Sequence, residues 1–474
     1  QYPSVGWLWR CAAGDPTLPD VVYGEGHPVR YPYHVNEYAH NYNNASGNLA
    51  DFQEAIESSN RIMGGAIWDW ADQTLLTDAG GRRVYGWGGT WGEKPEEGQG
   101  ILDGIVTGDR RPEPSYFEAQ HVYQNFSARL SDNGLRIVLV NKNYFRSSED
   151  FDCRLTRLRD GSPCGAPEAV KVDLPPQGRT EIPLPSAGDA VRIEFALKRG
   201  EGVWPAGWVV ARDQVNLSRK TPSFSPPAGT ARLIEEASDR LSVQSGDRVY
   251  SFSRRTGELV SLRKGGASGI ECLKAPMTLD AFRMPVGGET FYREGRMYFG
   301  RERLRDGLAE LRPELLKLET PQPGEDGSLI LKTVGRYRGA RRLDAPRYGH
   351  ALHTEILDLG PVDADAPGYV VTNEWRFYGE GVVRLKSSFS QFGRPTRVSR
   401  LGWRLVFDVA RTEVEYFARG PVDNYPDRMS GSFRGRYRGW SDAFGGDYTV
   451  SQDTGCREQA EEVSLVDPGV TVAT

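Results

Sequence analysis

The sequence has few cysteines, and they are not spaced like a disulfide framework or a zinc site. The five cysteines are scattered and odd in number, whereas disulfide scaffolds and zinc sites use even or tightly spaced sets. We therefore predict reduced, buried thiols. The alternative is one bridge between Cys153 and Cys164 across a hairpin.

Long apolar runs and an excess of basic charge are also lacking. No stretch approaches the 18 or so consecutive apolar residues of a membrane-spanning helix. The 59 Lys and Arg are outnumbered by 64 Asp and Glu, which gives a net charge of -5. Nucleic acid and membrane surfaces are therefore not expected partners. Three Asn-x-Ser sequons, at Asn44, Asn125 and Asn216, are interpreted as chance matches.

The length and composition of the chain predict a soluble protein of several domains. Apolar residues make up 38% and charged residues 26% of the 474 positions, which is ordinary for globular proteins. At roughly 100–200 residues per domain, about three domains are expected.

The first part of the chain, residues 1–125, mixes strand and helix patterns. The runs "HVNEYAH" and "RIMGGAIWDW" are typical of buried parallel strands. Between them, "NLADFQEAIESSNRIM" has apolar residues at helical spacing, and "SYFEAQHVYQNF" predicts a second helix. Strand, helix and strand in this order predict a βαβ unit.

From residue 126 onward the patterns are those of β structure. Short, often alternating runs over 126–216 predict an antiparallel sandwich. The Pro- and Gly-containing stretch 217–232 predicts a linker. Residues 233–474 predict one large β-sandwich, in which "DRVYSFSRRTGELVSLRK" is a hairpin with its turn at Thr256-Gly257.

A carboxylate and aromatic residues follow the two predicted parallel strands. Glu37 and His40 lie at the end of the first strand, and the second ends at Trp68-Asp69-Trp70. Indole faces stack on sugars, and carboxylates bond sugar hydroxyls, so this combination suits a carbohydrate site. Taken singly, each residue has a structural explanation: a solvated strand end, a capping histidine and a core indole. Since Trp68 and Trp70 alternate, one of the two is predicted to lie in the core.

Four stretches taken together resemble the second half of the large bacterial β-galactosidases of glycoside hydrolase family 2. These stretches are "NEYAHNYNNASGN", "GGAIWDWADQTLL", "GGTWGEKPEEGQGILDGIVTGDRRPEP" and, near the other end, "ARGPVDNYPDRMSGSF". The resemblance spans nearly the whole chain in order.

The resemblance implies a fold for each part of the chain. Residues 1–125 would be the C-terminal part of a (β/α)8 TIM barrel, and 126–216 an immunoglobulin-like β-sandwich. After the linker 217–232, residues 233–474 would form a large antiparallel β-sandwich of the galactose-mutarotase-like kind, truncated at its C-terminal end. Because the chain begins with Gln1 and opens like the interior of a domain, we expect a piece of a longer polypeptide.

The resemblance also implies roles for individual residues. Glu37 would be the catalytic nucleophile, and His40 and Trp68 would line the galactose pocket. Asp103 stands where the family has an Asn that helps bind sodium and the sugar's 6-hydroxyl, and Gly100 stands where it often has Phe. The acid/base Glu and the magnesium ligands would lie upstream of this chain, so magnesium and sodium are expected only by resemblance.

The implied function is retaining hydrolysis of terminal non-reducing β-D-galactosides through a covalent galactosyl-enzyme. The expected partner is a β-galactoside or galactose-containing oligosaccharide, together with further copies of the chain in a homo-oligomer. The expected compartment is the bacterial cytoplasm or periplasm. A second Asn-Glu pair, Asn373-Glu374, is predicted to be a surface pair, and the chain alone is expected to be inactive.

Two alternatives stay open. One is another family 2 exo-glycosidase, such as a glucuronidase, a mannosidase or an enzyme of marine polysaccharides, which the substitutions at Asp103 and Gly100 leave room for. The other is a non-catalytic carbohydrate-binding module built from the β domains.

Overall fold

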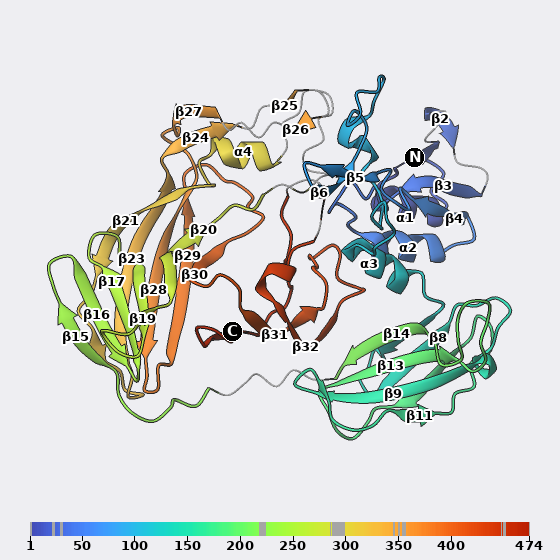
Figure 1. Cartoon of the computed structure of the whole chain (residues 1–474). Helices are drawn as coiled ribbons and strands as arrows, with labels where there is room; N and C mark the ends of the chain where they lie inside the picture. The colour runs from blue at the N-terminus through green and yellow to red at the C-terminus, as the bar shows by residue number, and fades with distance from the viewer. Residues whose placement is uncertain are drawn as a thin grey trace. The chain divides into compact units, whose positions relative to one another are not determined.

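The computed structural model describes residues 2–20, 24–28, 32–217, 224–284, 286, 299–344, 347–348, 351–352, 357–446, 448 and 452–473 (Figure 1). These residues form two compact units. One comprises Gln1–Thr221 with Glu413–Thr474, and the other comprises Pro222–Thr412. The predicted domain boundaries are not tested by this division and stay predictions.

The first part of the larger unit contains the predicted βαβ unit. Strand β3 pairs in parallel with β4, in a register that places Val35 opposite Gly65. Gly65 is needed there because a Cβ atom at this position would lie 2.7 Å from the Val35 carbonyl oxygen. Helix α2 joins the two strands and buries Leu49, Ala55 and Ile56. The elements are α1 (Val5–Ala12), β1 (Pro19–Asp20), β2 (Gly24–Pro28), β3 (Tyr33–Tyr38), α2 (Leu49–Glu57), β4 (Ile62–Ile67), β5 (Leu75–Ala79), β6 (Arg82–Gly86), η1 (Gly98–Ile101) and α3 (Pro114–Val122).

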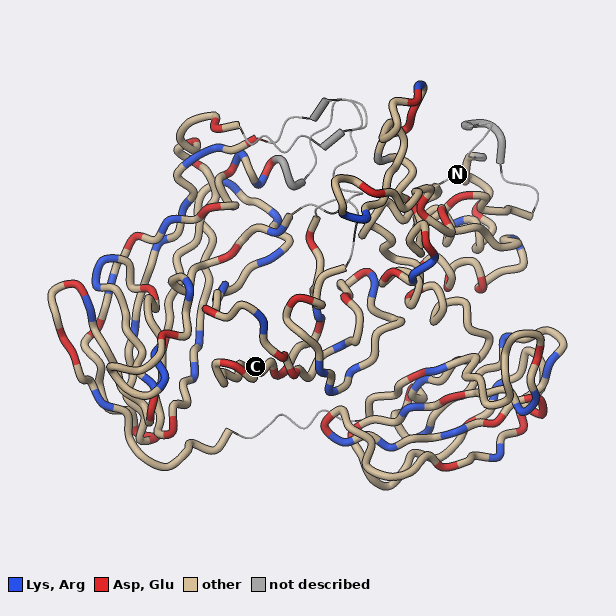
Figure 2. The backbone as a smooth tube through the Cα atoms, viewed as in Figure 1, with Lys and Arg blue, Asp and Glu red and all other residues tan. Residues whose placement is uncertain are grey.

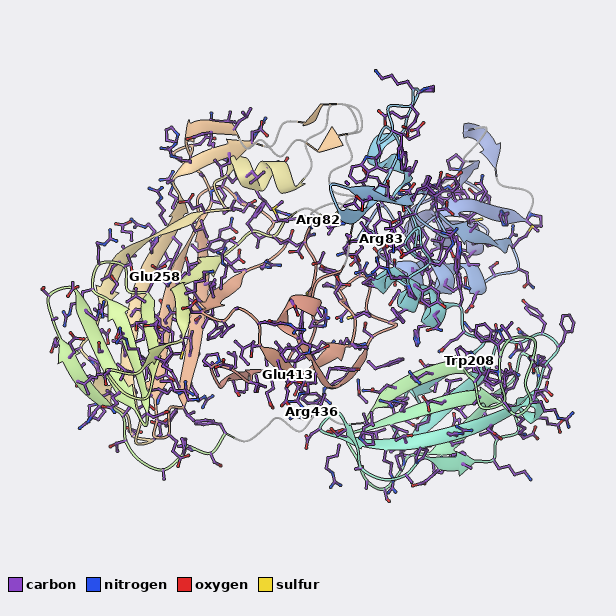
Figure 3. The ribbon with its side chains drawn as sticks, viewed as in Figure 1. Arg82, Arg83, Trp208, Glu258, Glu413 and Arg436 are labelled. Atoms are coloured by element: carbon purple, nitrogen blue, oxygen red, sulfur yellow. The ribbon has the colours of Figure 1, made fainter. Side chains whose placement is uncertain are left out.

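Several elements of this part were not predicted, among them helix α1 and the hairpin of β5 and β6. Helix α1 begins after Ser4, whose hydroxyl accepts a hydrogen bond from the Trp7 amide, and it buries Leu8 and Cys11. Strands β5 and β6 form a hairpin, and Arg82 and Arg83 lie at the start of β6 (Figure 3). The hairpin is largely exposed, so it lacks the apolar alternation by which a half-buried strand is recognised.

Two sheets form the predicted sandwich after α3. One sheet has the order β12-β8-β7, and the other has the order β10-β9-β13-β14 with β11 also pairing with β9. Their facing side chains share one core, in which the rings of Phe126 and Phe195 stack at 4.2 Å. The elements are β7 (Phe126–Leu130), β8 (Arg136–Asn141), η2 (Ser148–Asp150), β9 (Phe151–Arg159), β10 (Ser162–Pro163), β11 (Glu168–Val170), β12 (Arg179–Pro183), β13 (Ala190–Leu197) and β14 (Val209–Asn216).

The last part of the chain adds a four-stranded sheet to the larger unit. Its order is β32-β31-β33-β34, and Glu413 and Arg436 mark its first two strands in Figure 3. Glu118 of α3 accepts hydrogen bonds from the amides of Ser430 and Gly431, which joins this part to the first. The elements are β31 (Glu413–Gly420), β32 (Phe433–Trp440), η4 (Ser441–Ala443), β33 (Glu462–Leu465) and β34 (Val470–Ala473).

The second unit is almost entirely β structure. The hairpin predicted around Thr256-Gly257 is confirmed: β17 pairs with β18, and Gly257 adopts a φ of 76° at the turn, just before Glu258 (Figure 3). Its sheets are β15-β16-β17-β18-β19 and β21-β23-β28-β29 with β22, beside the two-stranded sheets β20-β30, β24-β27 and β25-β26. The elements are β15 (Arg232–Glu236), β16 (Arg240–Ser245), β17 (Arg248–Ser253), β18 (Leu259–Lys264), β19 (Ile270–Glu271), β20 (Leu273–Asp280), α4 (Phe299–Arg305), β21 (Leu311–Leu318), β22 (Gln322–Pro323), β23 (Leu329–Gly339), β24 (Arg341–Asp344), β25 (Arg347–Tyr348), β26 (Ala351–Leu352), β27 (Leu357–Pro361), β28 (Gly368–Phe377), β29 (Val383–Phe392) and β30 (Gly402–Phe407).

The structure can be compared with three expectations from the sequence: the state of the thiols, the distribution of charge and the presence of long apolar helices. All five cysteines are free, as predicted, but only Cys11, Cys153 and Cys272 are buried. Acidic and basic residues are interspersed along each unit (Figure 2). No helix in the described part of the chain combines the length and the apolarity that crossing a membrane requires.

Candidate active site

Glu37 lies at the C-terminal end of β3 and is half-buried. The Tyr2 hydroxyl is hydrogen-bonded to the Glu37 side chain, and the Tyr2 amide donates to the Glu37 carbonyl at 2.8 Å. Burial, followed by this bond and the Glu37 charge, raises the pKa of Tyr2 well above its usual value. The phenol therefore stays protonated and acts as a fixed donor to the Glu37 carboxylate.

His40 follows Glu37 on the loop that leaves β3. Its ring lies 5.4 Å from the Tyr2 ring, and its Nδ1 lies 3.8 Å from Asp103 Oδ1. Burial lowers the pKa of His40, although the charge of Glu37 acts in the opposite direction. A neutral imidazole is thus expected at neutral pH, where it can either donate or accept a hydrogen bond to a sugar hydroxyl.

Trp68 and Asp103 contact each other directly. Trp68 directly follows β4, its amide donates to the Tyr38 carbonyl at 3.1 Å, and its indole Nε1 donates to Asp103 Oδ2 at 3.1 Å. The Asp103 side chain is only 4% exposed. The indole is therefore held in a fixed orientation beside the histidine.

Three aspartates make this region strongly acidic. Burial, together with the negative charges of Asp72 and Asp69, raises the pKa of Asp103 to about 7 against the lowering effect of the Trp68 bond. Burial also raises the pKa of Asp72 to about 6, although its carboxylate accepts a hydrogen bond from the Gly104 amide at 2.9 Å. Both carboxyl groups are buried, and one oxygen of each accepts a hydrogen bond from the protein.

The side chains offer little for a metal ion. The described residues contain no group of three or more His, Cys, Asp or Glu that could hold one. Asp103 Oδ1 is buried and has no hydrogen-bond partner in the described part of the chain, which would suit one ligand of a monovalent cation. A single such oxygen does not build a magnesium site, whose octahedral shell needs several. Magnesium and sodium stay predictions.

The structure gathers the four predicted site residues in one place. Glu37 and His40 both contact Tyr2, while His40 and Trp68 both face Asp103. Tyr2 itself was missed, because a single tyrosine near the first residue carries no pattern. Its hydrogen bond to Glu37 depends on tertiary contact alone.

Two predictions about other residues were wrong. Neither Trp68 nor Trp70 lies in the core, since Trp68 is half-buried and Trp70 is 57% exposed. Asn373 and Glu374 do not form a surface pair. Asn373 is buried on β28, where it accepts a hydrogen bond from Ser387, while Glu374 pairs with Arg376 at 2.8 Å.

Three family models match consecutive parts of the chain. Residues 23–128 match "Glycosyl hydrolases family 2, TIM barrel domain", residues 137–218 match "Beta-galactosidase, domain 4", and residues 244–471 match "Beta galactosidase small chain". The TIM-barrel match agrees with the fold predicted for the first part of the chain. The arrangement of the domains stays a prediction.

Curated relatives named β-galactosidase match nearly the whole chain. A β-galactosidase of Enterobacter cloacae is 26% identical over 91% of this chain and 40% of its own length. A β-galactosidase of Klebsiella pneumoniae is 28% identical over 86% of this chain and 38% of its own. This chain therefore spans about 40% of the length of the relatives it matches.

Among solved structures, the exo-chitosanase CsxA of Amycolatopsis orientalis aligns with 72% of this chain and 33% of its own at 11% identity. The TM-score of 0.19 is far below that of a shared overall arrangement. The likeness to glycosyl hydrolase family 2 rests instead on the ordered matches to the three models and on the relatives. Over most of its length the chain is similar to β-galactosidases of that family.

Proposed function

We propose that this chain carries the nucleophile of a retaining glycoside hydrolase that cleaves terminal non-reducing β-D-galactosides. The observation that carries the proposal is the Glu37 carboxylate at the C-terminal end of β3, bonded by Tyr2 and placed with His40 and Trp68. Barrel enzymes hold their chemistry at this end of the strands. The names of the relatives support galactose as the sugar.

Glu37 acts by attacking the anomeric carbon. As the new C–O bond forms, the bond to the leaving oxygen breaks, and a second carboxylic acid gives that oxygen its proton. The same group then takes a proton from water, which displaces Glu37 and releases the sugar. Retaining enzymes hold the two carboxyl groups about 5–5.5 Å apart. Because Asp103 and Asp72 are buried and already accept hydrogen bonds from the Trp68 indole and the Gly104 amide, we assign the acid/base to a longer protein that includes this chain.

A panel of chromogenic glycosides tests the proposed sugar. We expect the longer protein to cleave a β-galactoside faster than a β-glucoside, a β-mannoside or any β-uronide. Uronides should be the poorest, because Asp69, Asp72 and Asp103 lie close together beside Trp68, where they would oppose a second negative charge. Faster cleavage of a glucuronide or a galacturonide would support the alternative of another family 2 specificity.

Replacing Trp68 by alanine should weaken catalysis far more than folding. The half-buried indole offers a face to a sugar, so kcat/KM for a galactoside should fall at least about tenfold. Thermal unfolding should show much less than the ~3–5 kcal/mol lost when a core aromatic is removed. Trp70→Ala, a change of the same size at a 57% exposed position, is the control and should keep its KM. A large stability loss with unchanged turnover per folded molecule would assign Trp68 to the core instead.

Replacing Asp103 by asparagine should stabilise the protein at high pH only. Because the folded-state pKa of about 7 lies above the usual value near 3.9, the folded protein retains a proton that the unfolded chain releases. Its free energy of unfolding therefore falls as the pH rises from about 4 to 7. Asn carries no such charge. At pH 8 the variant should melt several degrees above wild type, and at pH 4 the two proteins should melt at the same temperature. An equal gain in melting temperature at pH 4 and at pH 8 would contradict the shifted pKa.

A further inference from the structure

The loop that carries His40 has a backbone conformation that it would not keep unaided. Residues 39–48, here called the pocket loop, run from the end of β3 to the start of α2. Ala39, Asn43 and Asn48 have φ values of 48°, 53° and 59°. This left-handed region is unfavourable for residues that carry a Cβ atom, least so for asparagine. Such conformations persist when surrounding groups hold them in place.

Asn44 makes the contacts that hold the loop from outside. It is 4% exposed, and its Nδ2 donates to the Tyr425 hydroxyl at 3.1 Å and to the Asp453 carbonyl at 2.9 Å. Its backbone amide donates to Gln452 Oε1 at 3.1 Å, and its Oδ1 accepts from the Tyr448 hydroxyl at 2.9 Å. All four partners lie in the last part of the chain, 381 to 409 positions away in sequence.

Buried charges fix the partners of Asn44. Arg428 and Asp423 form an ion pair at 3.1 Å with side chains only 3% and 2% exposed. The Arg428 guanidinium lies 5.3 Å from the centre of the Tyr425 ring, and the other Asp423 oxygen accepts from the Gly455 amide at 3.2 Å. The late stretch "ARGPVDNYPDRMSGSF", which contains Asp423, Tyr425 and Arg428, thus supports the hydroxyl that Asn44 bonds.

The end of the pocket loop is bonded to the same stretch. The Asn48 amide donates to the Asp427 carbonyl at 2.6 Å. Gly47 packs so closely there that a Cβ atom would lie 2.1 Å from Asp427 Oδ2. The loop is therefore held at its middle and its end by one segment, while Asn41 and Asn43 bond the Trp68 and Leu102 carbonyls on its other side.

We propose that Asn44 is a positioning residue. Through it, the last part of the chain (residues 413–474) sets the conformation of the pocket loop and thereby the position of His40. This deepens the proposed function, on which its kinetic consequence rests. It also gives Asn44 a structural role in place of glycosylation, although the residue stands in an Asn-x-Ser sequon. The Nδ2 atom that a glycan would need is buried and donates two hydrogen bonds.

Hydrogen–deuterium exchange of the longer protein tests the positioning itself. Asn44→Ala removes the side-chain bonds, and Tyr448→Phe removes one hydroxyl with little change in shape. Both variants should raise exchange in peptides covering 39–48 at least about fivefold and leave the sandwich at 126–216 unchanged. Tyr437→Phe is the control, since its hydroxyl bonds the Phe433 carbonyl within the last segment. Unchanged exchange in the loop of both variants, or an equal rise with Tyr437→Phe, would overturn the proposal.

Kinetics of the same variants separate positioning from general stability. For Tyr448→Phe, whose hydroxyl also bonds the buried Arg428, we expect KM for a galactoside to rise roughly tenfold with a smaller change in kcat per folded molecule. Equal kinetic constants for Tyr448→Phe and wild type would contradict the link between Asn44 and the pocket. If the wild-type protein cleaves no glycoside, the proposed function fails, and the exchange experiment still decides whether Asn44 positions the loop.

Discussion

Glu37→Gln in the longer protein is expected to lower kcat for a β-galactoside by at least about 10⁴-fold, with KM little changed. The amide cannot form the glycosyl ester that splits the reaction into two steps. It has the size of the carboxylate, and its carbonyl oxygen can still accept the Tyr2 hydroxyl bond. Since Glu37 is half-buried at a strand end, folding should survive.

The matched control is Glu54→Gln, the same exchange at an exposed position of α2. It should leave both kinetic constants and the melting temperature unchanged. If Glu37→Gln turned over substrate at a rate near that of wild type, Glu37 could not be the nucleophile. Loss of both activity and thermal stability would instead mean that the carboxylate is needed for folding.

The 474-residue chain by itself is expected to show no turnover, and adding the preceding part of the longer protein should restore it. A (β/α)8 barrel takes about 250 residues, whereas the described residues before the sandwich supply one parallel strand pair, β3 with β4. Such strands leave unpaired edges, and Met63 of β4 and Trp70 just after it are 70% and 57% exposed. Glu37 also needs its acid partner within about 5 Å.

A chromogenic β-galactoside assay with and without the preceding part, in trans or by fusion, measures this effect. The sandwich at 126–216 has its own core and should fold in either case, which circular dichroism can verify. Robust turnover by the chain alone would mean that a described carboxylate, such as Asp69 or Asp72, supplies the proton.

Regular apolar spacing made β3, α2, β4 and α3 predictable from the sequence. One of the short runs that predicted the sandwich over 126–216 is "GVWPAGWVVARD", residues 202–213, yet β14 begins only at Val209. Pro205 and Gly207 form a turn there, which leaves Trp208 41% exposed (Figure 3). An aromatic residue next to valines looks alike in a strand and in a rigid loop, so spacing alone could not separate the two.

The candidate site was predictable only as far as its motifs reach. Family resemblance indicated Glu37, His40 and Trp68, which lie close in sequence to the strands that carry them. The Tyr2 bond to Glu37 and the contacts of Asn44 could not be predicted, because they join segments with no shared pattern. The partners of Asn44 are about 400 positions away in the sequence. From the sequence alone, a buried asparagine in this place cannot be distinguished from the asparagine of an exposed glycosylation sequon.

The central claim is that Glu37 forms a covalent bond to the sugar, and trapping that bond tests it most directly. A galactoside with fluorine at C2 and a good leaving group should react once and then stall, because fluorine slows hydrolysis of the intermediate. Mass spectrometry of the digested longer protein should find one fluorogalactosyl group, on the peptide that contains Glu37, and none after Glu37→Gln. A label on any other residue, or turnover without a label while galactoside cleavage proceeds, would contradict the account.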